Sequence, residues 1–160
     1  LIGRVSVDAA FYKKLSPKEN LLYSAFLYGL RHAEAEARAR DILGQLGFPL
    51  SRFNDPLEEM SRGMQQKIAI TRALIVQPPV LLLDEPTTGL DPITGKEIIK
   101  LIIEIQKKYN TTSLIISHDM NCVRMASNRV VVLVDGRCYA NGPYDELIKN
   151  ADPKVKQFFE

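Results

Sequence analysis

The sequence has few cysteines, no long apolar run and little net charge, and each scarcity excludes a class of protein. Its two cysteines, Cys122 and Cys138, lie far apart and in no metal-ligand spacing, which fits a reduced, cytosolic compartment. No apolar run approaches the roughly 18 residues of a membrane-spanning helix, and the start carries no signal-peptide pattern. The net charge is only +2 and no basic block occurs, so nucleic acid is not an expected partner.

The sequence does contain enough apolar material for a packed core. Of its 160 residues, 46% are hydrophobic and 25% are charged, which is typical of a globular protein rather than a disordered chain. The length suits one domain, or one and a half small subdomains.

A short apolar run opens the stretch Val80–Asp91, VLLLDEPTTGLD. Because prolines bound this run on both sides, it predicts a strand buried on both faces of a parallel sheet. Asp84 and Glu85 follow at the carboxyl end of the strand, where ligands bind in open α/β sheets. A carboxylate pair in such a place needs a neutralising partner. On these residues alone, a helix cap or a surface turn explains the pair equally well.

An upstream block, Met60–Leu74 (MSRGMQQKIAITRAL), predicts a helix that could bind an anion at its amino-terminal end. Ser61 is a suitable N-cap for a helix over Met64–Val76. The free N–H groups and the helix dipole at that end favour an anion, and Gly63 lets the backbone approach a phosphate closely. A plain serine-capped helix explains Ser61 equally well in isolation.

A downstream block, Leu114–Asp119 (LIISHD), places a histidine directly after a second apolar strand. The strand is expected over Ser113–Ile116, after a helix that Pro92 opens and that runs to about Tyr109. His118 then lies at the carboxyl end of this strand. A lone histidine in this position is also explained as a satisfied structural residue.

Two further helices are predicted nearer the start of the chain. Ser16 and Glu19 can form a capping box, with proline at the first helical position between them. An apolar face follows at helical spacing, and we expect it to pack in the core rather than to stack on a ligand: Leu21, Leu22, Ala25, Phe26 and Tyr28. An Ala-rich helix is expected over His32–Leu46, with favourable i,i+4 pairs on a solvated face: Glu34–Arg38 and Glu36–Arg40.

Taken together and in this order, the three blocks resemble the motifs of the ATP-binding-cassette (ABC) ATPases, and the resemblance covers nearly the whole chain. Met60–Met64 resembles their signature motif, usually LSGGQ, in the SRGM variant that many exporter-type subunits carry. Val80–Asp84 resembles the Walker B strand, Gly89–Asp91 the D-loop and His118 the switch histidine. The implied fold class is α/β: a partial RecA-like P-loop NTPase parallel sheet with an α-helical subdomain.

The resemblance also implies a role for each matching residue, with ATP and Mg²⁺ as the ligands. Asp84 would hold Mg²⁺, a hard cation that prefers oxygen ligands, and Glu85 would be the general base for the attacking water. His118 would contact the γ-phosphate, and Asp91 would couple two nucleotide sites across a dimer. The signature residues would bind the ATP that a partner subunit holds: Ser61, Arg62, Gly63 and Met64.

Two elements of the family pattern are missing from this sequence. A gap-free match to the family's Q-loop puts Val7 where the metal-sensing glutamine would be, which indicates either a lost role or a shifted register. The phosphate-binding pattern G-x-x-x-x-G-K-[ST] does not occur, since Gly95-Lys96 is followed by Glu97 and preceded by Leu90 at the first glycine position. The family carries this loop upstream.

Because the chain begins at Leu1 rather than Met, we expect that an upstream segment is missing. Two consequences are predicted for the chain alone. Its ATP hydrolysis would be negligible, and its sheet would have an unpaired apolar edge beside the histidine strand.

Three parts are expected along the chain. Residues 1–15 contain a strand end and the degenerate Q-loop. Residues 16–77 form the α-helical subdomain with the signature motif, which in the family touches the membrane-spanning partner. Residues 78–160 form a portion of the RecA-like core, which closes with a hairpin turning at Asp135-Gly136 and two helices.

The function that the resemblance implies is that of a fragment of an ABC transporter's ATP-binding subunit, which powers transport by ATP-driven dimerisation. The expected partners are a second nucleotide-binding domain and a transmembrane permease, at the inner, cytoplasmic face of the cell membrane. A soluble ABC-type ATPase, or a non-catalytic ABC domain that pairs with a complete ATPase, remains an alternative. The sequence names neither the transported substrate nor the direction of transport.

Overall fold

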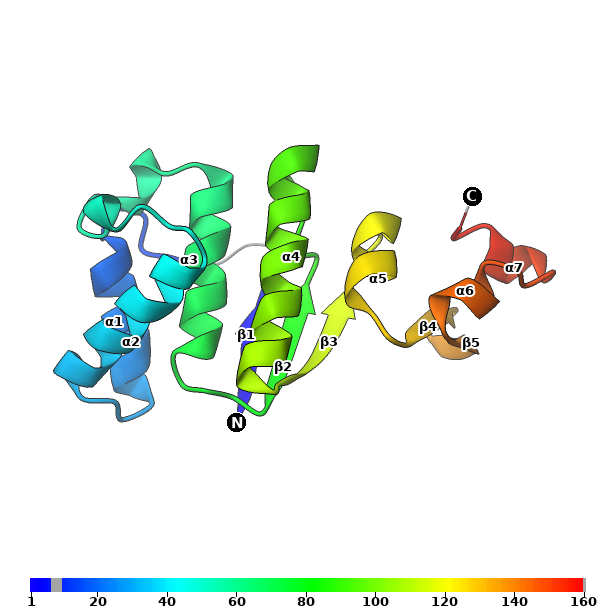
Figure 1. The fold of residues 1–160 in the computed structure, drawn as a ribbon, viewed down its shortest axis with the longest axis horizontal. Coiled ribbons are helices and arrows are strands. Elements are labelled where there is room, and N and C mark those ends of the chain that lie inside the picture. Colours follow the sequence, from blue (N-terminus) through cyan, green and yellow to red (C-terminus); the bar gives the residue numbers. More distant parts are fainter. Residues whose placement is uncertain (7–9, 160) are drawn as a thin grey trace. The chain divides into compact units, whose positions relative to one another are not determined.

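A computed structural model describes residues 1–6 and 10–159 of the chain, which forms two compact units, Leu1–Ile116 and Ser117–Glu160. The first unit mixes strands and helices, so the expected α/β class is confirmed (Figure 1). Its elements in chain order are β1 Ile2–Val5, α1 Pro17–Leu27, α2 His32–Gln45, the 3₁₀ helices η1 Leu50–Arg52 and η2 Leu57–Glu59, α3 Arg62–Leu74, β2 Val80–Asp84, α4 Pro92–Tyr109 and β3 Thr112–Ile116.

The sheet of the first unit is parallel and has the strand order β1-β2-β3. Val5, Leu83 and Ile115 lie side by side in this register, and their side chains share one face of the sheet. Helices α3 and α4 cover that face, as Figure 1 shows. The resulting core is apolar throughout: Val5, Ile42, Leu46, Ala69, Ile70, Ala73, Leu74, Leu81, Leu83, Ile98, Ile102 and Ile105.

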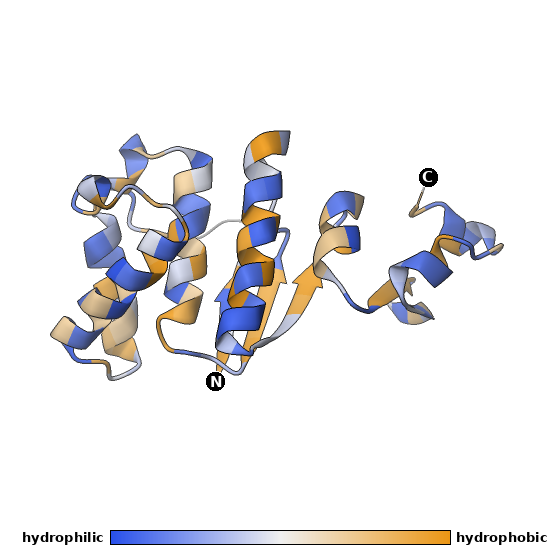
Figure 2. Ribbon diagram, in the orientation of Figure 1, coloured by the Kyte–Doolittle hydropathy of each residue, from blue (hydrophilic) through white to orange (hydrophobic). Residues whose placement is uncertain are grey.

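The opposite face of the sheet is open, which corrects the expectation that Val80–Leu83 is buried on both faces. Leu81 and Leu83 are fully buried, but Leu82 is only half-buried. On the neighbouring strands the same face exposes 63% of Ile2, 60% of Leu114 and 51% of Ile116. Figure 2 shows the strands as mostly hydrophobic. The reason is that, among the described residues, helices pack on one side of the sheet only.

Strand β3 lies at the end of the three-stranded order, so one edge of it has no strand partner among the described residues. This arrangement agrees with the predicted unpaired edge beside the histidine strand. An apolar edge strand of this kind is a template for pairing with another chain.

The helical part of the first unit has its own core, to which α1, α2 and α3 contribute. Leu21 and Ala25 of α1 are buried in it, as expected, but Phe26 is 74% exposed and Tyr28 is 54% exposed. The prediction that these aromatic side chains pack in the core is therefore wrong. Helix α1 covers the subdomain with one narrow side, which leaves its remaining apolar residues on the surface.

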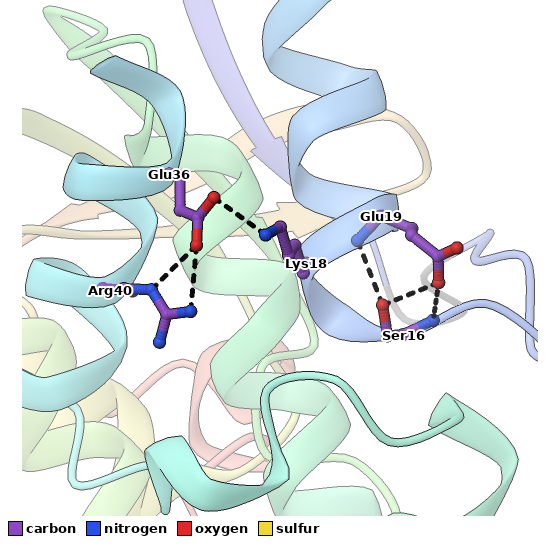
Figure 3. A network of polar contacts seen from close by, with 5 residues as sticks. All are labelled: Ser16, Lys18, Glu19, Glu36 and Arg40. Carbon is purple, nitrogen blue, oxygen red and sulfur yellow. Dashed lines mark hydrogen bonds and ion pairs between the residues drawn. The ribbon is translucent and has the colours of Figure 1, made fainter. Parts of the chain in front are cut away.

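The amino-terminal end of α1 carries the predicted capping box, drawn in Figure 3. The Ser16 Oγ accepts a hydrogen bond from the Glu19 amide at 3.2 Å, and the Glu19 carboxylate accepts one from the Ser16 amide at 2.8 Å. Behind the cap, the buried Asn20 side chain bonds to Tyr12, Leu15 and Ser16. These bonds fix the chain that enters the helix.

An ion-pair network joins α1 to α2 (Figure 3). The Glu36 carboxylate forms ion pairs with Lys18 and with Arg40, each at 2.9 Å. The predicted Glu36–Arg40 pair is therefore confirmed, and Lys18 of α1 is an additional partner. The pair Glu34–Arg38 also forms, at 2.6 Å. Hydrogen bonds from Lys18 and then from Arg40 lower the pKa of Glu36 below its ordinary value of 4.5.

We predict that Glu36→Gln lowers stability near neutral pH and has no effect in acid. A lowered pKa in the folded state means that ionised Glu36 stabilises the fold above pH 4.5, and that this stabilisation is lost as the pH falls through the folded-state value. The free energy of unfolding of wild type and variant, measured in urea at several pH values, should therefore converge as the pH falls below the folded-state pKa of Glu36. The control is Glu58→Gln, an exposed glutamate on η2. Equal curves for the two variants at every pH would contradict the prediction.

Helix α3 begins on its predicted cap, Ser61, and helix α4 begins directly after Asp91. Helix α3 begins at Arg62 rather than at Met64, because Ser61 caps it by accepting from the Met64 amide at 3.2 Å. Helix α4 has the bounds that the sequence predicted, and it ends at Asn110 in the left-handed conformation. Its apolar side faces the sheet core.

The second unit contains a helix and a hairpin with two short helices. Its elements are α5 Met120–Ala126, β4 Val130–Val134, β5 Arg137–Gly142, α6 Tyr144–Leu147 and α7 Pro153–Lys156. The predicted turn at Asp135-Gly136 is confirmed, with φ of 51° and 73°, the two positive values that a type I′ turn requires. The small core consists of Val132, Leu147 and Val155.

Among the described residues, no helix combines the length and apolar composition needed to cross a membrane. The three-part division at residues 15 and 77 stays a prediction.

Candidate active site

The two carboxylates of the central strand lie at its carboxyl end, as the sequence predicted. Asp84 is the last residue of β2, and 30% of its side chain is exposed. Glu85 follows with a φ of 49°, a left-handed conformation that is uncommon for a residue other than glycine. The Glu85 amide donates a hydrogen bond to the Ile116 carbonyl at 2.8 Å, which fastens this turn to the end of β3. Such strained residues concentrate at functional sites.

The turn after Glu85 holds the carboxylate in place. The Thr88 amide donates to the Glu85 carbonyl at 3.1 Å, and the Thr88 hydroxyl donates to the Glu85 Oε2 at 3.3 Å. Thr87 is 9% exposed and its carbonyl accepts from the Leu90 amide at 3.2 Å. The side chain that could act as a base is therefore fixed at the end of two adjacent strands.

Asp84 is the side chain that fits a hard cation. The Arg4 Nη2 of strand β1 lies 3.9 Å from its Oδ2, a long ion pair. No cluster of three or more His, Cys, Asp or Glu occurs among the residues that the structure describes. A carboxylate oxygen is the kind of ligand that Mg²⁺ takes, usually from one or two carboxylates together with substrate phosphates and water.

Asp91 caps helix α4, a role that was not expected from its likeness to the D-loop. Its Oδ1 accepts from the amides of Ile93 at 3.1 Å and Thr94 at 3.0 Å. Hydrogen bonds from the Thr94 hydroxyl and then from the Thr94 amide lower the pKa of Asp91. The sequence carried the signal for this cap, since aspartate directly before a proline that opens a helix is typical of an N-cap.

The signature residues form the amino-terminal end of α3. The amides of Arg62 and Gly63, the first two helical residues, have no acceptor among the described residues. The backbone groups that the predicted anion site needs are therefore available, while the binding of an anion there stays a prediction. Met64 packs half-buried against the helical core, so its side chain belongs to the fold rather than to a surface.

The first turn of α3 packs against the segment that carries Asp91. Gly63 is buried, and a Cβ on it would lie 2.7 Å from the Thr94 Cγ2. The Arg62 guanidinium lies against Gly89 in the same way, with a φ of 74° at that glycine. The structure thus brings the signature residues together with the turn after Glu85. This close packing explains why position 63 is a glycine, and the sequence alone did not indicate that contact.

His118 belongs to the second unit, where its side chain is exposed at the start of α5. The following Asp119 caps that helix by accepting from the Asn121 amide at 2.9 Å. The role of His118 toward a phosphate stays a prediction. Val7, the residue at the Q-loop position, lies outside the described residues.

A parallel sheet with helices on one face defines an α/β class of protein, in which ligands bind at the carboxyl ends of the strands, where Asp84 and Glu85 lie. The comparisons with known proteins narrow this class. A family model described as "ABC transporter" matches residues 1–88. The chain belongs to this family, and its fold is that of the RecA-like P-loop ATPase cassettes.

Two curated relatives illustrate the likeness. The chain is 36% identical over 143 residues to the ABC transporter ATP-binding protein NatA of Bacillus subtilis, which covers 89% of the chain and 57% of the relative. It is 33% identical over 141 residues to the methionine import ATP-binding protein MetN 2 of Listeria monocytogenes, covering 88% of the chain and 41% of that protein. The chain therefore spans about half the length of the curated relatives it matches.

A solved structure agrees with this assignment. The ATP-binding cassette MJ0796, in a dimeric post-hydrolysis state bound to ADP and Pi, matches with a TM-score of 0.77 and 30% identity. The match covers 89% of this chain and 62% of the cassette.

Proposed function

We propose that this chain is part of an ATP-hydrolysing subunit of an ABC transporter, and that the subunit powers transport by ATP-driven dimerisation of its nucleotide domains. The observation that carries the proposal is the pair Asp84 and Glu85 at the carboxyl end of β2. Glu85 is held there in a strained conformation by its bond to Ile116. Family membership supplies the reaction class, and this geometry supplies a base beside a cation-binding carboxylate.

In the proposed reaction, Glu85 accepts a proton from the water whose oxygen attacks the γ-phosphorus of ATP. A general base of this kind contributes about 10²–10⁴-fold to a rate. Asp84 would hold Mg²⁺, which when bound neutralises charge on the phosphate oxygens. His118 would contact the γ-phosphate.

The signature residues would act on the ATP of a partner subunit. Ser61 offers its hydroxyl, and the amides of Arg62 and Gly63 point out of the end of α3. Asp91, next to this end of the helix through Thr94, would couple the two sites. The dimeric state of MJ0796 with ADP and Pi supports such a pairing.

A membrane permease is the second proposed partner, with the subunit bound at the inner, cytoplasmic face of the membrane. Large apolar side chains are exposed along α1: Tyr23, Phe26, Leu27 and Tyr28. The Tyr12 ring packs edge-on against Tyr23 at 5.7 Å and extends this surface. Exposed apolar surface of this kind marks a site for a protein partner, which supports a permease as that partner.

We propose further that the native protein is longer than this chain, with the phosphate-binding loop upstream and the three parts 1–15, 16–77 and 78–160 as predicted. The curated relatives support this, because the chain spans only about half of their length.

The proposal predicts that the native protein has a mass well above 18.0 kDa and hydrolyses ATP, whereas the 160-residue chain does not. Intact-mass measurement on protein from the source cell and a phosphate-release assay on both forms test this. Co-purification with a multi-span membrane protein identifies a transporter. A native mass near 18.0 kDa would overturn the proposal and favour a non-catalytic domain that pairs with a complete ATPase.

A further inference from the structure

Arg62 occupies a place that local electrostatics disfavours. It is the first residue of α3, at the positive end of the helix dipole, and the first turn carries no acidic residue. Its side chain is exposed, and it has no ion-pair partner among the described residues. A cation at this end is opposed by the dipole, so the helix itself gives no reason for an arginine. Residues that break a local rule are expected where function requires them.

The Arg62 side chain does have a defined neighbour, which is the backbone of Gly89. A Cβ on Gly89 would lie 2.8 Å from the Arg62 Nη1, 2.9 Å from its Cζ and 3.3 Å from its Nε. Three atoms of the planar group thus crowd the space that a side chain would take. Gly89 also has a φ of 74°, which favours glycine. The conformation at this position favours glycine, and a side chain there would have to displace the Arg62 guanidinium.

A second contact runs parallel to the first. Gly63, the next residue of α3, is buried against the Thr94 methyl group, and the Thr94 amide bonds to Asp91 at 3.0 Å. The first turn of α3 therefore contacts both sides of Asp91, through Gly89 before it and Thr94 after it.

We propose that Arg62 is a positioning residue, which stacks on Gly89 and fixes the turn of residues 87–91 relative to the amino-terminal end of α3. A guanidinium suits this role because it is planar and weakly hydrated, so it can lie flat on a peptide group, whereas a lysine ammonium is a compact, strongly hydrated charge. The consequence is that Asp91 and Ser61 move as one body within a subunit. The role of this coupling in ATP turnover rests on the proposed function, but the contact itself does not.

Hydrogen exchange on the full-length native protein tests the contact without reference to activity. Arg62→Ala should speed exchange of the amides that the turn protects by roughly two- to five-fold, the range of an exposed side-chain contact. These amides belong to Thr88, Leu90, Ile93 and Thr94. Arg62→Lys should behave as Arg62→Ala does. Lys96→Ala, which removes an exposed positive charge from the first turns of α4, should leave the exchange unchanged.

Unchanged exchange in Arg62→Ala would overturn the proposal, as would full protection in Arg62→Lys, since charge alone would then suffice. A double-mutant cycle adds an independent readout. Gly89→Ala should destabilise the protein more when Arg62 is present than in the Arg62→Ala background, because the added methyl collides with the guanidinium only in the former. If the two substitutions had additive effects on stability, the proposed contact would also be contradicted.

A second experiment measures ATP turnover by the same variants. Arg62→Ala should lower kcat by roughly two- to ten-fold at unchanged KM, because the residue orders the site rather than binding free ATP. An unchanged kcat with altered exchange would confine Arg62 to folding and overturn the positioning role. Wild-type protein without ATP turnover would overturn the proposed function, while the exchange result would still decide the contact.

Discussion

Replacing Glu85 by glutamine is expected to slow ATP hydrolysis by the full-length protein by about 10²–10⁴-fold, the usual contribution of a general base. The substitution keeps the size of the side chain. It also leaves a carbonyl oxygen that can accept a hydrogen bond from the Thr88 hydroxyl, which in the wild type lies 3.3 Å from the Glu85 Oε2. It removes the group that accepts the proton from water. Binding of ATP should be retained, because the change is made at the proton acceptor and not at Asp84.

The measurements for this prediction are the rate of phosphate release and the affinity for a labelled ATP. Glu97→Gln is a matched control, since it removes the same charge from an exposed position on α4. Phosphate release at the wild-type rate by the Glu85→Gln protein would show that another group is the base. Loss of ATP binding would instead show that Glu85 shapes the nucleotide site.

The elements of this fold could be predicted wherever the signal is local. The capping box at Ser16 and Glu19 and the bounds of α4 depend on residues within a few positions of one another. The hairpin at Asp135-Gly136 depends on two residues that tolerate positive φ. In each case the backbone group and the side chain that satisfies it are neighbours in the chain, so the sequence contains the whole interaction.

The candidate site was predictable in its residues but not in its contacts. The sequence placed Asp84 and Glu85 at the end of a strand, yet the left-handed conformation of Glu85 depends on β3, which lies far along the chain. The packing of Arg62 on Gly89 likewise joins distant residues. Contacts of this kind leave no periodic pattern, because a single arginine or glycine carries no information about its neighbour.

Burial was the least predictable property. An apolar strand between prolines has the same sequence pattern whether helices cover one face of the sheet or both. The exposed Phe26 and Tyr28 likewise continue the helical spacing of Leu22 and Ala25, as buried residues would. Apolar character predicts that a surface is to be covered, but not whether the same chain covers it.

The uncovered sheet leads to the second large effect: the 160-residue chain studied alone is expected to self-associate at micromolar concentration, corresponding to about 8 kcal/mol of association free energy. Ile2, Leu114 and Ile116 are each more than half exposed on one sheet face, and β3 offers an edge with no strand partner among the described residues. Sedimentation velocity over a range of concentrations measures the association. Thermal unfolding should shift to higher temperature as the concentration rises, since association stabilises the folded chain.

Paired lysine substitutions, Leu114→Lys with Ile116→Lys, should abolish this association, because charges on an edge strand block pairing and repel a second apolar face. Val131→Lys is the control, as this residue is also about half exposed, at 52%, but lies on β4 of the other unit. If the wild-type chain were a monomer with a sharp, concentration-independent melt, the open face would be stable in water and the prediction would fail. If Val131→Lys reduced association as strongly as the lysine pair does, the hairpin rather than the sheet would be the surface through which the chains associate.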